Sequence, residues 1–259
     1  MLTLADKIAL PRALLARRCA DRPRDFFPTG LAALDAIAPS GGLQWGAIHE
    51  LLFDAGGCAP RFPALLLARA AQGAGDGVVV FSDPRRELHP TAIAMAGVDL
   101  RRVILLRPRN RGQEISALAE CLRCKGVSAT LTLLDRLGDI EARRLQLAAE
   151  AGGGVGVFMR PQARNKSPSA SHYAAATRWR VRPVLKDETD AMEDGDTQSW
   201  IIELLHGHGG RLGESVLLEV DRETGDVRKT TELRETSDVR AASVLAHRPR
   251  AAPPARATA

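Results

Sequence analysis

The sequence predicts an α/β protein with a mostly parallel sheet that is flanked by helices and extended by antiparallel strands toward the C-terminus. Two observations support the parallel part. Short β-branched segments alternate with amphipathic segments between residues 47 and 159. The β-branched segments are almost continuously apolar, which is typical of strands buried on both faces. A third observation supports the edge: after residue 161 apolar and polar residues alternate with a period of two.

The predicted elements follow in chain order. Strands are expected at Ala47–Phe53, Val78–Phe81, Val103–Leu106, Ala129–Leu134 and Gly154–Met159, and helices at Leu31–Ile37, Pro63–Gln72, Pro90–Ala96, Glu114–Lys125 and Ile140–Ala151. Crossovers of this length between parallel strands are right-handed. The first part of the core is therefore a series of βα units.

The C-terminal part of the core is expected to add antiparallel strands at one sheet edge. These are Thr177–Arg182, which alternates arginine with apolar residues, then Ser199–Leu205 and Val216–Val220. The polar segment Gln162–Ser171 and the acidic segment Asp187–Asp196 read as loops, and a tight turn follows at 224–226.

Three regions are expected along the 259 residues: a helical extension at 1–25, a core at 26–234 and a basic, disordered Ala/Pro/Arg-rich tail at 235–259. The extension is either a partner-binding or capping helix or a packing helix. A formal net charge of +5 permits binding to DNA, RNA or acidic protein without requiring it. Because no secretory signal or membrane-length apolar run appears, we expect a soluble, cytoplasmic protein.

Cysteine and histidine spacing does not predict a metal site. Cys121 and Cys124 form a lone CxxC inside a predicted amphipathic helix, and no second pair follows at a zinc-like distance. We interpret them as packed, reduced thiols. His206 and His208 flank one glycine in a late turn, but no third ligand is evident. We expect neither a metal nor another cofactor.

The segment after the first strand has the layout of a phosphate-binding loop without its chemistry. A strand, a glycine-bearing turn and a helix occupy residues 47–72, and Gly56, Gly57 and Arg61 are present. The Gly-Lys-Ser/Thr that contacts the phosphates and Mg²⁺ is absent. Pro60 and Pro63 lack the backbone N–H groups that a phosphate nest needs. The turn therefore predicts a vestigial nucleotide pocket.

Several segments resemble the RecA-like ATPase core, and more closely the ImuA family. The resemblance covers about residues 26–228. The more specific segments are RRLQLAAEAGG at Arg143–Gly153 and ATRWR at Ala176–Arg180; the shared ones are the lead-in Phe27–Gly46 and the segment Phe81–Pro90. The ImuA family is a group of RecA-like bacterial proteins encoded beside translesion-synthesis components. The resemblance implies a RecA-like fold.

The resemblance also places the residues that hydrolysis would need. The catalytic glutamate of the family falls near Arg85, with Asp83 and Glu87 two residues to either side. Asp135 stands where a Walker B aspartate would be, or it simply begins the next turn. Without the lysine, and with a cation in place of the catalytic base, we expect no efficient ATP hydrolysis.

Basic residues are the remaining candidates for binding. By resemblance, Arg160, Arg164 and Lys166 lie where a recombinase presents a DNA-binding loop, or they belong to a solvated positive loop. Arg107, Arg109 and Arg111 follow a predicted strand end, at the edge where open α/β sheets bind ligands. They form a DNA-facing or protein-docking patch, or another solvated loop.

The resemblance implies a non-catalytic accessory factor of SOS-induced translesion synthesis. Its implied partners are the polymerase-like ImuB protein, an error-prone replicative-type polymerase subunit, RecA and DNA. Two other hypotheses stay open at this point. One is a nucleotide-dependent enzyme with an atypical phosphate loop that remodels RecA or DNA filaments, and the other is a module that binds single-stranded DNA.

Overall fold

A nine-stranded sheet forms the centre of the computed structural model, which describes residues 25–162, 175–184, 197–221 and 223–233. The strand order is β11 (Val227–Leu233), β10 (Ser215–Asp221), β9 (Thr197–Gly207), β8 (Thr177–Val184), β3 (Ile48–Asp54), β7 (Val155–Gln162), β6 (Val127–Leu133), β4 (Val78–Ser82) and β5 (Val103–Leu106). The expected N-terminal helix, the loops around 163–171 and 187–196, and the tail lie outside the described residues.

The strand directions confirm a mostly parallel sheet with antiparallel strands at its C-terminal end. In the strand order, the six strands from β5 to β8 run parallel to one another. β9 pairs antiparallel with β8, and β10 and β11 continue the antiparallel pairing. One detail of the prediction is wrong: β8 pairs in parallel with β3 through Thr177, opposite His49, to Arg180, opposite Leu52. The antiparallel part therefore begins one strand later than expected. β11 follows the predicted turn, where Gly225 has φ +77°.

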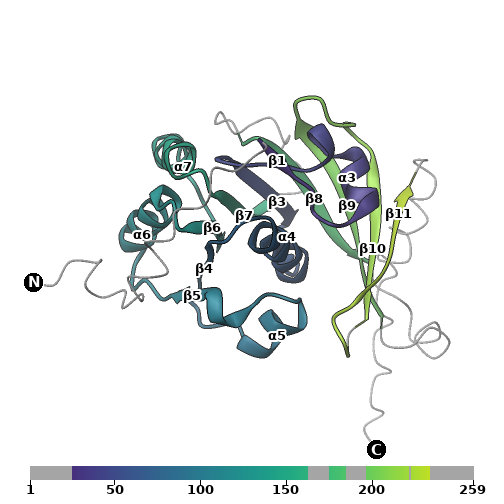
Figure 1. Cartoon of the computed structure of the whole chain (residues 1–259), viewed down its shortest axis with the longest axis horizontal. Coiled ribbons are helices and arrows are strands. Elements are labelled where there is room, and N and C mark those ends of the chain that lie inside the picture. Colours follow the sequence, from purple (N-terminus) through teal and green to yellow (C-terminus); the bar gives the residue numbers. More distant parts are fainter. Residues whose placement is uncertain (1–24, 163–174, 185–196, 222, 234–259) are drawn as a thin grey trace, which may run out of the picture.

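Helices cover both faces of the sheet (Figure 1). On one face lie α4 (Arg61–Ala74) and, over β10 and β11, α3 (Ala32–Ile37); on the other lie α6 (Arg111–Arg123) and α7 (Asp139–Gly152). The smaller elements are β1 (Phe26–Phe27), η1 (Pro39–Gly41), β2 (Leu43–Gln44), α5 (Pro90–Met95) and η2 (Leu100–Arg102). The alternation of β3 separates two cores: Leu51 and Phe53 pack with α4, while Ile48 packs with α6 and α7.

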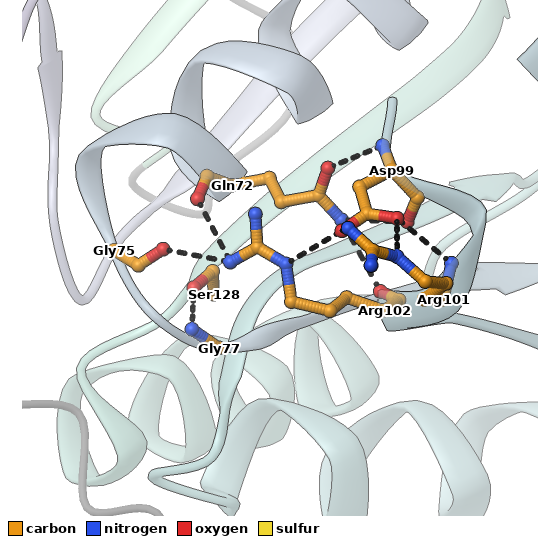
Figure 2. Close-up of polar contacts among 7 residues, drawn as sticks. All are labelled: Gln72, Gly75, Gly77, Asp99, Arg101, Arg102 and Ser128. Atoms are coloured by element: carbon orange, nitrogen blue, oxygen red, sulfur yellow. Dashed lines mark hydrogen bonds and ion pairs between the residues drawn. The ribbon is translucent and has the colours of Figure 1, made fainter. Parts of the chain in front are cut away.

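A polar network around the buried Gln72 connects the segment between α5 and β5 to the end of α4 (Figure 2). The Gln72 side chain accepts a hydrogen bond from the Asp99 amide at 2.7 Å and donates to the carbonyls of Asp99 and Arg102. Arg102 Nη1 in turn donates to the carbonyls of Gln72 and Gly75. Hydrogen bonds from Arg101 hold the pKa of Asp99 below its usual value. The buried amide of Gln72 thus satisfies backbone groups just before the chain enters β5.

One buried histidine ties the first core strand to its neighbours. His49 Nε2 lies 2.9 Å from the Gln44 carbonyl, so this nitrogen donates. Nδ1 then accepts from the Thr177 hydroxyl at 2.8 Å, and that hydroxyl accepts from Trp179 Nε1. Burial lowers the pKa of His49 to about 4. The network therefore requires a neutral imidazole.

Among the helices of the described residues, none combines the length and the hydropathy of a membrane-spanning segment.

Candidate functional site

The candidate site is a depression at the carboxyl ends of β4, β6 and β7, the edge where open α/β sheets bind ligands. The start of α4 and the loop after β4 form its other walls. Its lining includes Arg61, Ser82, Asp83, Arg85, Glu87 and Met159. Of the four residues predicted for a vestigial nucleotide pocket, Arg61 lines this depression, and Gly56, Gly57 and Asp135 do not.

Backbone N–H groups of the turn between β3 and α4 donate hydrogen bonds to carbonyls of the same turn. The Gly57 amide donates to the Asp54 carbonyl at 2.8 Å, and the Arg61 amide donates to the Ala59 carbonyl at 2.8 Å. Gly56 is exposed with φ +86°, as such a tight turn requires. Pro60 is the N-cap of α4 and has no N–H to offer. These positions contribute little to an anion-binding nest.

Two ion pairs connect the side chains around this depression. Arg61, at the first position of α4, pairs with Glu87 in the loop after β4. Arg85 lies 2.7 Å from Asp135, which follows β6. Arg85, which the resemblance places near the catalytic glutamate, therefore pairs with Asp135, the candidate Walker B aspartate. All four side chains are partly exposed, at 36–60%.

Asp83, the other carboxylate close to the catalytic position, shapes the loop. It is 4% exposed and accepts hydrogen bonds from the amides of Glu87 and Leu88 at 2.8 and 3.3 Å. Those bonds close the loop in which Arg86 takes a left-handed conformation at φ +56°. The Asp83 carboxylate thus stabilises the turn through hydrogen bonds, and the Glu87 carboxylate forms an ion pair with Arg61.

Sequence reasoning missed a buried carboxylate beneath this edge. Glu114 of α6 is 8% exposed and accepts hydrogen bonds from the hydroxyls of Ser82 at 2.7 Å and Thr132 at 3.2 Å. These contacts join the helix to the ends of β4 and β6. A glutamate in the first turn of an amphipathic helix ordinarily favours the helix dipole, so the sequence carries no signal of its burial.

A second buried carboxylate, Glu50 in β3, explains the position of one predicted binding residue. Glu50 is fully buried and lies 2.6 Å from Arg160 of β7 and 2.8 Å from Arg178 of β8. The Arg160 side chain is only 17% exposed. Its guanidinium therefore belongs to an ion-pair cluster across three central strands. Arg164 and Lys166, predicted beside it, lie outside the described residues.

The arginines that follow β5 divide into two kinds. Arg111 at the start of α6 donates to Glu141 at 2.6 Å and to the Arg136 carbonyl at 2.7 Å. Burial acts to raise the pKa of Glu141, but the hydrogen bonds from Arg111 and the Gly138 amide outweigh it and lower the pKa. Arg107 and Arg109 are exposed, and neither takes part in an ion pair within the described ranges. These two remain available to an anionic partner.

The two cysteines of the CxxC motif pack inside the protein, whereas the two histidines are exposed. Cys121 is buried and Cys124 half-buried, both as free thiols. Burial, with a smaller contribution from Cys124, raises the pKa of Cys121 to about 12, so the thiol is unreactive. His206 and His208 are exposed and line a groove at the amino ends of β3 and β8. Within the described ranges, no three His, Cys, Asp or Glu side chains converge as a metal site.

Comparison with known proteins gives clear relatives, although no family model matches the chain. The chain is 30% identical over 204 residues to the protein ImuA of two Caulobacter vibrioides strains, NA1000 and CB 15, with 75% of this chain and 84% of the relative covered. It is also 34% identical over 91 residues to the cell division inhibitor SulA of Edwardsiella piscicida, with 35% of this chain and 54% of the relative covered. The identity to ImuA extends through most of both chains, and this protein therefore belongs to the ImuA family.

Proposed function

We propose that this chain is a non-catalytic accessory protein of SOS-induced translesion DNA synthesis, in which a RecA-like core serves as a docking module for polymerase components. Membership of the ImuA family supports a role in damage-induced mutagenesis. The described architecture, a mostly parallel sheet between helices, is compatible with a RecA-like core. The finer statement, that the protein docks its partners without catalysing a reaction, rests on the residues of the candidate site.

The ion pair between Arg85 and Asp135 carries the non-catalytic part of the proposal. Phosphoryl transfer from ATP needs a lysine at the phosphates, a hydroxyl on Mg²⁺ and a carboxylate that orients water. Here arginine stands at the carboxylate position and neutralises the aspartate that would approach the metal. Arginine at position 61 does not replace the compact lysine, and it is held by Glu87. Losing such groups costs orders of magnitude in rate.

The proposed partners are an ImuB-like polymerase-fold protein, an error-prone replicative-type polymerase subunit, RecA and DNA. The exposed Arg107 and Arg109 suit an anionic surface on one of them. An adaptor needs only stable, exposed docking faces. It can therefore keep the sheet and helices while the pocket changes.

Two assays on the purified full-length chain test the proposal. We expect ATP turnover with Mg²⁺ to equal the buffer blank, and we expect direct binding to at least one of the two polymerase components. Arg61→Ala serves as the pocket variant and should change neither result. Turnover that Arg61→Ala abolishes would instead support a nucleotide-dependent remodelling enzyme, and absence of binding to every proposed partner would refute the adaptor role.

The exposed Arg107 and Arg109 also favour a second candidate function, binding of single-stranded DNA. Each phosphate contact contributes a salt-dependent term, so removing two contacts should reduce the slope of log affinity against log salt by about 1.4. Fluorescence anisotropy with labelled single strands would compare the native chain with Arg107→Ala/Arg109→Ala. Arg123→Ala, which removes an arginine already paired with Glu120, is the matched control. Absent or salt-independent binding would count against this candidate.

A further inference from the structure

The loops that follow β4 and β5 carry three arginines that no carboxylate of the described residues neutralises. Arg86 after β4, and Arg107 and Arg109 after β5, are exposed and take no part in an ion pair within those residues. The two strands are neighbours at one end of the sheet (Figure 1). Because the Asp83 amide donates to the Leu106 carbonyl at 2.8 Å, the two loops leave the sheet side by side. We call these three residues the arginine patch.

The carboxylates around the arginine patch are paired, buried or balanced. Three of them each have an arginine partner, in the pairs Glu87–Arg61, Asp135–Arg85 and Glu141–Arg111. Asp83 and Glu114 are buried, and they accept hydrogen bonds from backbone amides and from hydroxyls respectively. In the segment after β6, the exposed Asp139 is balanced by the exposed Arg136. The excess charge at this edge of the sheet is therefore the positive charge of the patch.

The backbone of Arg86 adopts a conformation that its side chain does not favour. Its φ is +56°, and Ser40 is the other non-glycine residue of the described chain with a positive φ. The Asp83 carboxylate fixes this turn from below by accepting hydrogen bonds from the amides of Glu87 and Leu88. Glycine or asparagine would adopt the left-handed conformation at lower cost, so the turn itself gains nothing from an arginine. The strain therefore points to a use of the exposed guanidinium outside the loop.

We propose that the arginine patch docks an acidic segment of a partner protein, whose carboxylates pair with the guanidinium groups of Arg86, Arg107 and Arg109. Arginine binds carboxylates through two parallel hydrogen bonds, which gives such pairs both strength and direction. Single-stranded nucleic acid, the other anionic ligand, is bound largely by stacking of its bases on aromatic side chains. No aromatic side chain in the described part of the chain is exposed, and the half-buried Phe62 stacks on Trp200. The surface thus favours an acidic protein segment.

The inference rests on the proposed function, since it names the surface that docks one of the polymerase components. Isothermal titration calorimetry would measure binding of that component to the full native chain, to Arg107→Glu/Arg109→Glu and to Arg86→Asn. The charge reversal should weaken binding by about tenfold or more, and Arg86→Asn by about threefold or more. Asparagine tolerates the left-handed backbone, so Arg86→Asn should not lower the melting temperature. Arg143→Glu/Arg144→Glu makes the same charge change at two exposed arginines of α7, and this control should bind normally.

A labelled glutamate-rich peptide serves as an independent probe in fluorescence anisotropy. It should bind the native chain and the α7 control but not Arg107→Glu/Arg109→Glu, and its glutamine-for-glutamate version should not bind. If the polymerase component binds the native chain and both patch variants equally well, the docking surface is wrong and the adaptor function stands. If no polymerase component binds but the acidic peptide binds through the patch, the adaptor function fails and the docking chemistry stands. A single-stranded oligonucleotide that binds through the patch and displaces the peptide would overturn the proposal in favour of nucleic acid.

Discussion

At the scale of single residues, the buried imidazole of His49 links the stability of the protein to pH. The native pKa of about 4 lies below the ordinary value of 6.5. Between these values the unfolded chain binds a proton that the native chain does not, so stability is complete above about pH 6.5 and falls toward pH 4. The loss should total about 3 kcal/mol.

Urea denaturation between pH 4 and 7 measures this effect. His49→Gln should lower stability at neutral pH, because the contacts with Thr177 and Gln44 change, but it should flatten the dependence on pH across that window. An unchanged slope in the variant would show that His49 is not the titrating group.

The contrast between buried and exposed ion pairs gives a second residue-scale prediction. Glu50→Gln should cost about 3–5 kcal/mol in the free energy of unfolding, because it withdraws the carboxylate from the buried guanidinium of Arg178. Glu87→Gln, which breaks the half-exposed pair with Arg61, should cost about 1 kcal/mol or less. Chemical denaturation of both variants tests the difference, and equal costs would contradict the assignment of Glu50 to the core.

At the scale of elements, the close approach of α6 and α7 depends on one glycine. Gly152→Ala would bring a methyl group against the Leu122 carbonyl and force the helices apart. We expect a loss of about 3 kcal/mol in stability. Gly73→Ala is the matched control, since this glycine of α4 has open space around its Cα and the substitution should stabilise by about 0.5–1 kcal/mol. Thermal unfolding in which both variants behave alike would exclude the tight contact.

The elements were largely predictable because local periodicity determines them. Continuous apolar runs identified β3 and β6, and the amphipathic pattern identified α6 and α7 within one to three residues. The parallel pairing of β8 with β3 was not predictable, because strand partners depend on contacts between distant segments. For the same reason the sequence did not indicate that Glu50 and Glu114 are buried. Glu50 meets its partners on two neighbouring strands, and Glu114 of α6 meets its partners on β4 and β6.

At the candidate site too, residue types could be predicted from the sequence, and contacts between distant segments could not. The missing lysine and the cation at position 85 can be read directly from the sequence, since they depend on residue type at a known spacing. The pairing of Arg85 with Asp135 joins loops after two different strands, so only the fold reveals it. Arg160 was predicted as a binding residue from its place along the chain, whereas its partner Glu50 lies on a neighbouring strand.

At the scale of the whole molecule, the sheet and its two helical layers are well packed, while half-exposed ion pairs connect the side chains of the candidate site. Arg107 and Arg109, which follow β5, are exposed and take no part in these pairs. This distribution supports our proposal of a docking protein. Its surfaces, and not its pocket, would then determine its contribution to mutagenesis.

The frequency of damage-induced mutations in cells that carry a pocket variant tests this central claim most directly. Cells that lack the native gene would express either the native chain or Arg61→Ala/Asp135→Asn at matched protein levels. The account predicts that the pocket variant restores mutagenesis as fully as the native chain does, because no nucleotide chemistry is required. Loss of mutagenesis in the pocket variant, with the folded protein present at its native level, would contradict it.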